Sequence, residues 1–323
     1  MGLAKEAVGV RSRAIWIYLL VAVCLAGIYF FELRQKRIRI AERISSTVMF
    51  KVKPLEISSF VISKGGVKIV ATRVKEHDSA NTNWKITSPI RARADGLRVQ
   101  QFLEKLSKLR WQRKISEGQE NLAQFGLNNP SVVISFQGNN ASGTLSIGSQ
   151  TPFGDDVYVQ RNGDKSVYTI SFADKFDLDV DLFDLRDKRL ITLDPSEITR
   201  VTIERNGKDK WVLKKTGDKW LFSDGEHFEA SPERVRALLL RLWTMRATSI
   251  QEERAEDLSK YGLNRPRVKI QVCGAGQSQE LWIGNSAKKQ EGLYAKVVHK
   301  PLIVTITSWI LSDIPTTPEG FRK

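Results

Sequence analysis

The sequence contains few of the residues that carry most enzyme chemistry. Its 323 residues include two cysteines, Cys24 and Cys273, and three histidines, which are widely separated. Two cysteines exclude a disulfide-rich scaffold and a cysteine-based zinc site, and the histidines never approach ligand spacing. The motifs G-x-S-x-G, H-E-x-x-H and C-x-x-C are absent. The sequence therefore predicts no catalytic residue, no metal site and no cofactor.

Long apolar runs are also scarce, and only one could span a membrane. Residues 14–31 read AIWIYLLVAVCLAGIYFF, without a charge, and as a helix would extend about 27 Å. No small-x-small cleavage site follows, so an uncleaved anchor is favoured over a signal peptide. Aromatic residues occupy both ends, as in interfacial belts, and are Trp16, Tyr18, Tyr29, Phe30 and Phe31.

The remaining composition is that of a globular protein, because 41% of the residues are hydrophobic and 27% are charged. The length suggests about two domains. The net charge of +15 is concentrated near the anchor, where residues 1–53 hold ten Lys and Arg against three Asp and Glu. This charge predicts contact with anionic lipid head groups rather than with nucleic acid.

An internal duplication with a period of 136 residues is the strongest signal. Residues 84–160 align with 220–296 without a gap, and 22 of the 77 positions are identical. Two copies of one domain therefore follow the anchor. The positions that recur form a repeat signature, which we expect to be mainly structural: Trp84, Gly126, Leu127, Pro130, Gly148 and Tyr158 in the first copy, and Trp220, Gly262, Leu263, Pro266, Gly284 and Tyr294 in the second.

Each copy has the same predicted order of elements. Three strand-like segments precede a helix with an apolar face, which is expected to begin after Asp95 in the first copy and Ser231 in the second. A short helix ends at Gly126 or Gly262, and three or four strands follow. This order predicts antiparallel α+β domains. The predicted parts are a cytoplasmic N-terminus (1–13), a transmembrane helix (14–31), a basic juxtamembrane stalk (32–56), copy one (57–173), a connector (174–196), copy two (197–312) and a C-terminal tail (313–323).

The repeated tryptophan strand, the [FY]-G-L-x-x-P turn and the following I-G strand, behind one apolar helix, resemble the bacterial "domain of unknown function 4340" proteins. The likeness covers most of residues 57–312. The resemblance implies an inner-membrane protein with its large domain in the periplasm, associated with ABC-type transporter or gliding-motility-like components. The charge of the two flanks alone does not fix this orientation. The family has no assigned catalytic residues, so none are carried over.

Two other patterns have a simpler explanation than a ligand site. Asp177, Asp179 and Asp181 form D-x-D-x-D, but a calcium loop would need glycine and glutamate further on, so a solvated linker is the expectation. Lysines interleave with Trp211 and Trp220, as in single-strand nucleic-acid binding. Because Trp84 recurs in a copy without that basic run, Trp220 is predicted to be a core residue.

These observations predict a non-enzymatic, membrane-anchored envelope protein that binds or scaffolds a partner, which the resemblance suggests is an ABC-type transporter-like complex. Equivalent grooves in the two copies could bind one elongated partner. Two alternatives remain open. One is an envelope carbohydrate-processing hydrolase, which would need two carboxyl groups about 5–10 Å apart. The other is a ligand-binding sensor at the junction of the repeats.

Overall fold

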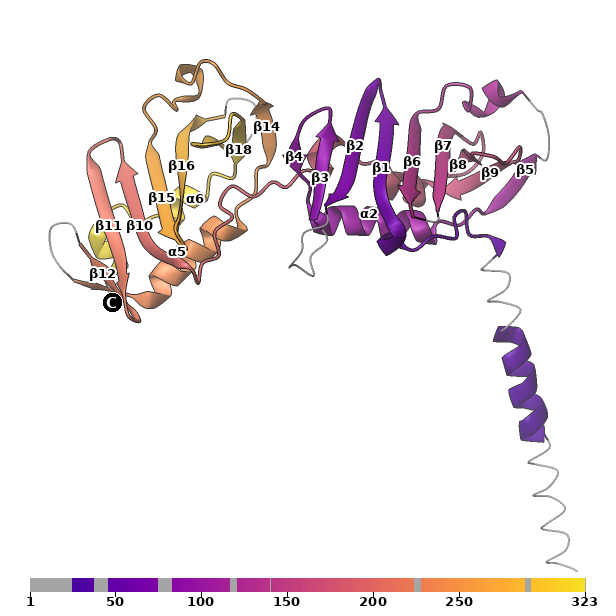
Figure 1. Cartoon of the computed structure of the whole chain (residues 1–323), viewed down its shortest axis with the longest axis horizontal. Helices are drawn as coiled ribbons and strands as arrows, with labels where there is room; N and C mark the ends of the chain where they lie inside the picture. Colours follow the sequence, from indigo (N-terminus) through magenta and orange to yellow (C-terminus); the bar gives the residue numbers. More distant parts are fainter. Residues whose placement is uncertain are drawn as a thin grey trace, which may run out of the picture. The chain divides into compact units, whose positions relative to one another are not determined.

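The computed structural model describes residues 25–37, 46–74, 83–116, 121–139, 141–223, 228–287 and 292–322. The chain divides into two compact units, Met1–Leu185 (unit 1) and Arg186–Lys323 (unit 2). A helix covers residues 25–37 (Figure 1), and the rest of the predicted span, including Trp16 and Tyr18, lies outside the described residues. Among the helices that the structure describes, none is long and apolar enough to cross a membrane.

Unit 1 contains a nine-stranded sheet in which every neighbouring pair of strands is antiparallel. The order across the sheet is β4-β3-β2-β1-β6-β7-β8-β9-β5 (Figure 1). The strands are β1 (Ile57–Lys64), β2 (Val67–Val74), β3 (Asn83–Ser88), β4 (Ala92–Arg93), β5 (Arg113–Ser116), β6 (Val132–Gly138), β7 (Ser142–Gln150), β8 (Asp156–Arg161) and β9 (Val167–Ser171).

The helix α2 (Gly96–Lys108) packs its apolar face on this sheet. Asp95 caps it, because its carboxylate accepts hydrogen bonds from the backbone N–H groups of Leu97 and Arg98 at 3.1 Å each. Val99, Phe102, Leu103 and Leu106 are buried at the 3.6-residue spacing. Phe102 packs 5.1 Å from Phe60 of β1, which also meets Trp84 of β3. The core thus ties the strands before the helix to the helix itself.

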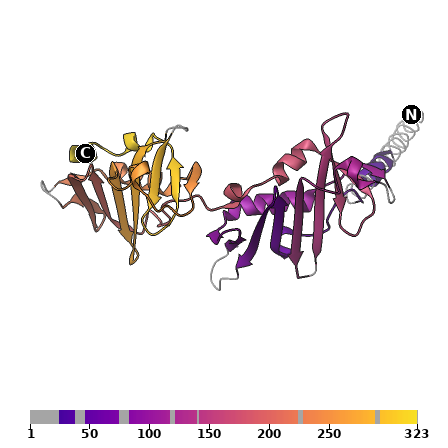
Figure 2. The ribbon, with the colours of Figure 1, turned by 90° about the horizontal axis from the view of Figure 1, so that it is seen from above.

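Unit 2 repeats this architecture strand for strand. Its sheet order, β13-β12-β11-β10-β15-β16-β17-β18-β14, is that of unit 1 shifted by nine strands (Figures 1 and 2). Ser231 caps its main helix α5 (Pro232–Thr244). The strands are β10 (Ile198–Arg205), β11 (Asp209–Thr216), β12 (Lys219–Phe222), β13 (Glu229–Ala230), β14 (Ser249–Glu252), β15 (Val268–Gly274), β16 (Gln277–Ser286), β17 (Leu293–Val297) and β18 (Ile303–Ile306). The predicted tandem antiparallel α+β fold is confirmed.

The duplication is longer than the sequence alignment predicted, which corrects the connector and the tail. The first half of the connector forms α3 (Phe172–Leu178) and α4 (Leu182–Leu185) on unit 1. The matching residues of unit 2 form α6 (Ile310–Asp313) and a 3-10 turn, η4 (Pro318–Phe321). The backbone carbonyl of Leu185 accepts from Asp95, and that of Phe321 accepts from Ser231, 136 residues later in both cases. Both segments therefore complete their own repeat.

The start of each repeat was also misassigned, to the stalk and to the second half of the connector. Val48 forms a β-bridge with Arg110, and Arg189 forms the equivalent bridge with Arg246. The apolar residues beside these bridges are buried in the two cores: Met49, Phe50 and Val52 in unit 1, and Leu190, Ile191 and Leu193 in unit 2. Burial of these side chains, rather than linker flexibility, accounts for the residues between the predicted domains.

A hydrogen-bonded network holds the start of unit 1 to its sheet. Arg161 of β8 donates to the carbonyl oxygen of Met49 at 2.9 Å and to Asp164 at 3.1 Å. Asp164 also accepts from the Tyr168 hydroxyl at 2.7 Å and from the backbone of Ser166. Burial raises the pKa of the Asp164 carboxyl, but these hydrogen bonds and Arg161 outweigh it and lower the pKa to about 2. The ionised carboxylate therefore stabilises the folded state.

We expect Asp164→Asn to remove a pH-dependent part of the stability of unit 1. A carboxyl whose folded pKa is lowered contributes above its ordinary value of 3.8, and the contribution disappears as the pH falls toward 2. Urea unfolding should show a less stable variant at pH 7 and a shrinking difference between pH 4 and 2. Asp155→Asn, which replaces an exposed acid of the same unit, is the control. A constant difference at every pH would contradict this role.

Candidate functional site

The repeat signature forms a compact internal cluster in unit 1. Leu122–Phe125 forms a 3-10 turn, η2, which ends at Gly126 in the left-handed conformation with φ of 68°. The turn lies against β7 at Gly148, where a Cβ atom would be 2.1 Å from the carbonyl oxygen of Phe125. Glycine is therefore required in β7 because the turn approaches its backbone directly. The two motifs are the two sides of one packing contact.

Unit 2 contains the same cluster. Gly262 has the same φ of 68°, and a Cβ at Gly284 would lie 2.2 Å from the carbonyl oxygen of Tyr261. The recurring tyrosines pack against the aromatic residue of the turn, with ring centroids 4.8 Å apart for Phe125 and Tyr158 and 4.9 Å for Tyr261 and Tyr294. Leu127, Leu263 and Pro266 are buried, while Pro130 is partly buried. In both units the signature residues pack against one another.

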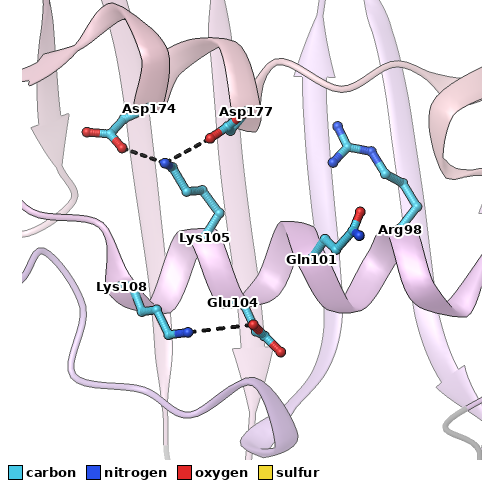
Figure 3. Close-up of a pocket in the computed structure, with 7 residues that line it drawn as sticks. All are labelled: Arg98, Gln101, Glu104, Lys105, Lys108, Asp174 and Asp177. Carbon is cyan, nitrogen blue, oxygen red and sulfur yellow. Dashed lines mark ion pairs between the residues drawn. The ribbon is translucent and has the colours of Figure 1, made fainter.

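A charged hollow lies on the outer side of α2 in unit 1 (Figure 3). Its volume is about 360 Å³. Lys105 lies between two carboxylates of α3, with its Nζ atom 2.7 Å from Asp174 and 2.8 Å from Asp177. We call this feature the α2 hollow, and its lining residues are Arg98, Gln101, Glu104, Lys105, Lys108, Asp174 and Asp177.

The charges of the α2 hollow favour binding over catalysis. Burial lowers the pKa of Lys105, but hydrogen bonds and attraction from Asp174 and Asp177 outweigh burial, so this pKa lies above its ordinary value. A lysine that acts as nucleophile or base needs a lowered pKa, and a glycosidase needs one protonated carboxyl group. A charged lysine shared by two carboxylates provides neither. Polar recognition of a partner is the chemistry that this arrangement can support.

The central ion pair recurs in unit 2, although its surroundings do not. Arg241, the counterpart of Lys105, lies 3.6 Å from Asp313, the counterpart of Asp177. The rest of the equivalent surface is apolar: Leu240 replaces Glu104, and Trp309, placed under the guanidinium of Arg241 at 5.0 Å, replaces Ala173. Leu240 and Trp309 are 51% and 43% exposed. One conserved contact thus supports two chemically different exteriors.

The D-x-D-x-D segment is not the solvated linker that the sequence predicted. Asp177 binds Lys105, and Asp179, with only 16% of its side chain exposed, forms ion pairs with Lys64 and Lys175. Asp181 accepts a hydrogen bond from the backbone of Asp184. Each carboxylate thus has a different partner. Among the described residues, no group of three or more His, Cys, Asp or Glu is placed to hold a metal ion.

The tryptophans of the basic run are core residues. Trp211 and Trp220 are 7% and 6% exposed and belong to the core cluster of unit 2. The prediction for Trp220 is confirmed. They cannot serve as stacking platforms for bases without unfolding the sheet.

Sequence reasoning missed the α2 hollow because its two sides are about seventy residues apart. The signal that could have found it was the identity of Asp177 and Asp313 at the same 136-residue offset, beyond the aligned range. The residues predicted for the membrane interface and visible in the structure, Tyr29, Phe30 and Phe31, are exposed on the helix over 25–37.

The fold and its hollow define a tandem α+β repeat protein with a polar surface site. The model of the family described as "Domain of unknown function (DUF4340)" matches residues 84–227 and 220–323. The chain therefore belongs to this family, and the two matches begin 136 residues apart, at Trp84 and Trp220. No match was found among curated proteins or among solved structures.

Proposed function

We propose that this protein is a non-enzymatic, membrane-anchored envelope protein whose two repeat units bind a partner, an ABC-type transporter-like complex of the inner membrane. The difference between the two exteriors carries the proposal. Unit 1 presents the α2 hollow, whereas unit 2 presents Leu240 and Trp309 at the same place in the fold. Two unlike surfaces on one scaffold suit a partner that has both polar and apolar contact sites.

Arg98 is the residue of the α2 hollow best placed to contact a partner. Its side chain forms no hydrogen bond or ion pair with any residue that the structure describes. Its counterpart, Arg234, donates to the carbonyl oxygen of Gly320 at 2.5 Å in unit 2. The same position is thus satisfied internally in one unit and open in the other. An open guanidinium readily binds a carboxylate or a backbone carbonyl group.

The anchor rests on the apolar segment 14–31 and on the exposed side chains that continue it. On the helix over 25–37, large apolar residues are 59–69% exposed, and these are Leu25, Ile28, Tyr29, Phe30 and Phe31. Such a surface favours a lipid environment. A membrane tether would keep both units near a membrane partner at high effective concentration, so that each contact could remain weak. The transporter-like partner and the periplasmic placement follow from the family resemblance.

Site-specific photocrosslinking in cells tests this proposal. A photoreactive amino acid at Gln101 in the α2 hollow, and separately at Leu240, should capture the same inner-membrane transporter-like subunits in the full-length protein. Deletion of residues 1–33 should lower the yield by about tenfold or more, because it removes the tether. Circular dichroism should show that the shortened protein remains folded.

Matched positions away from both surfaces provide the control. Lys85 is exposed in β3, and Lys208 is exposed in the turn before β11. Crosslinkers at these positions should recover background proteins only. Equal recovery from Lys85 and Gln101, or capture that is unaffected by loss of the anchor, would refute the proposal.

A further inference from the structure

A second hollow lies at one end of the sheet in unit 2, and three cations line it. Its volume is about 470 Å³, within the range of small-molecule sites. Arg200 of β10 and Lys214 and Lys215 of β11 face the turn between β15 and β16, residues 273–278. The lining contains no acidic residue. We call this feature the hairpin hollow.

The three cations are not neutralised by the protein. Among the residues that the structure describes, none forms a hydrogen bond or an ion pair with the side chains of Arg200, Lys214 or Lys215. Other lysines of the same sheet are paired, since Lys219 lies 3.0 Å from Glu229 and Lys269 lies 2.9 Å from Glu204. The unpaired charge is therefore concentrated at one end of the sheet.

The strand register makes this arrangement unfavourable in the absence of a ligand. Arg200 and Lys214 are direct cross-strand partners of β10 and β11. Like charges at directly opposed positions destabilise a sheet. An anion placed between them would convert this repulsion into two attractive contacts.

The other copy of the fold shows that the repeat does not require these charges. The residues of unit 1 that correspond to Arg200 and Lys214 in the register are Ser59 and Thr72, which are also direct partners. Their other neighbours match as well, because Ser59 pairs with Gln137 and Arg200 pairs with Cys273. The same strand pairing therefore forms with two hydroxyl side chains. The positive charge is a property of unit 2 alone.

We propose that the hairpin hollow binds the phosphate group of a small molecule or lipid head group. A guanidinium fork and two flexible ammonium groups around one hollow match the charge and hydrogen-bonding capacity of a single phosphate. An extended nucleic acid fits less well, because Trp211 and Trp220 are buried and cannot stack with bases. This site goes beyond the proposed partner binding and does not depend on it.

Calorimetric titration of the full-length protein in a neutral detergent tests the site, with inorganic pyrophosphate as the probe. The double variant R200S/K214T introduces the residues of unit 1 and should lower the affinity by about tenfold or more, because two charge-assisted contacts are lost. The same exchange should raise the melting temperature of the unliganded protein by about 1–3 °C, since it removes the repulsion. This rise also shows that the variant is folded.

The control variant K208S/K210T removes two positive charges from the opposite end of the same hairpin, where Lys210 pairs with Glu204 in the register. Its affinity should stay within about twofold of the original protein. Competition by short-chain phosphatidylglycerol would identify a lipid head group as the source of the phosphate, and its failure would indicate a soluble phosphate compound. Equal binding by R200S/K214T, no binding by the original protein, or equal competition by polyglutamate would overturn the proposal.

Discussion

Gly284→Ala is expected to destabilise unit 2 by about 3 kcal/mol, near the upper end of the range for overpacked positions. The added Cβ would lie 2.2 Å from the carbonyl oxygen of Tyr261, which is far below a van der Waals contact. The obstacle is backbone, so it cannot move aside as a flexible side chain could. Thermal unfolding should show a decrease of about 10 °C in the transition of unit 2. Gly148→Ala should act in the same way on unit 1.

Gly276→Asn in the neighbouring turn is the control for this substitution. Gly276 has a φ of 71° and no atom within 4 Å of an added Cβ. Asparagine tolerates the left-handed region, so the cost should be below about 1 kcal/mol. If Gly284→Ala and Gly276→Asn were equally stable, the turn would not pack on β16 as the structure shows.

The repeated fold was predictable because its signals are local. Strand segments with alternating burial, the caps at Asp95 and Ser231, and the glycines that end the short helices all act within a few residues. The structure places each of them as predicted. The short strands β4 and β13 were missed because two residues carry no periodicity.

The errors at the ends of each repeat have a common physical cause. Residues 178–185 alternate apolar and acidic side chains, which suggests an exposed linker when the partners are unknown. In the folded chain Leu178 and Leu185 are fully buried, and their counterparts Ile314 and Phe321 are buried in unit 2. The side chains at these positions differ in size and shape, so a comparison of identities does not detect them. Only the three-dimensional contacts show that they are equivalent.

The two hollows were beyond sequence reasoning for a different reason. The α2 hollow joins Lys105 to a helix about seventy residues later, and the hairpin hollow depends on which residues of three strands stand opposite one another. Register is a property of pairing between distant segments. The lysines of β11 were visible in the sequence, but the strand pairing singles out Lys214, opposite Arg200, from the others.

Trp220→Ala is expected to lower the stability of unit 2 by about 3–5 kcal/mol, because it empties a large volume in a packed core. Trp84→Ala should have the same effect on unit 1, where the indole is 3% exposed and packs 5.3 Å from Phe60. Each tryptophan belongs to a separate core cluster. Calorimetry should therefore show that each substitution lowers one unfolding transition and leaves the other in place.

Trp309→Ala is the matched control, since this indole is 43% exposed and contacts Arg241 through a cation–π interaction. Its loss should cost about 1 kcal/mol or less. A Trp220→Ala protein as stable as the original would mean that this side chain is not part of the core, and would restore a surface role in stacking. A single transition lowered equally by Trp84→Ala and Trp220→Ala would show that the duplicated domains unfold as one body, although each has its own sheet, helix and core.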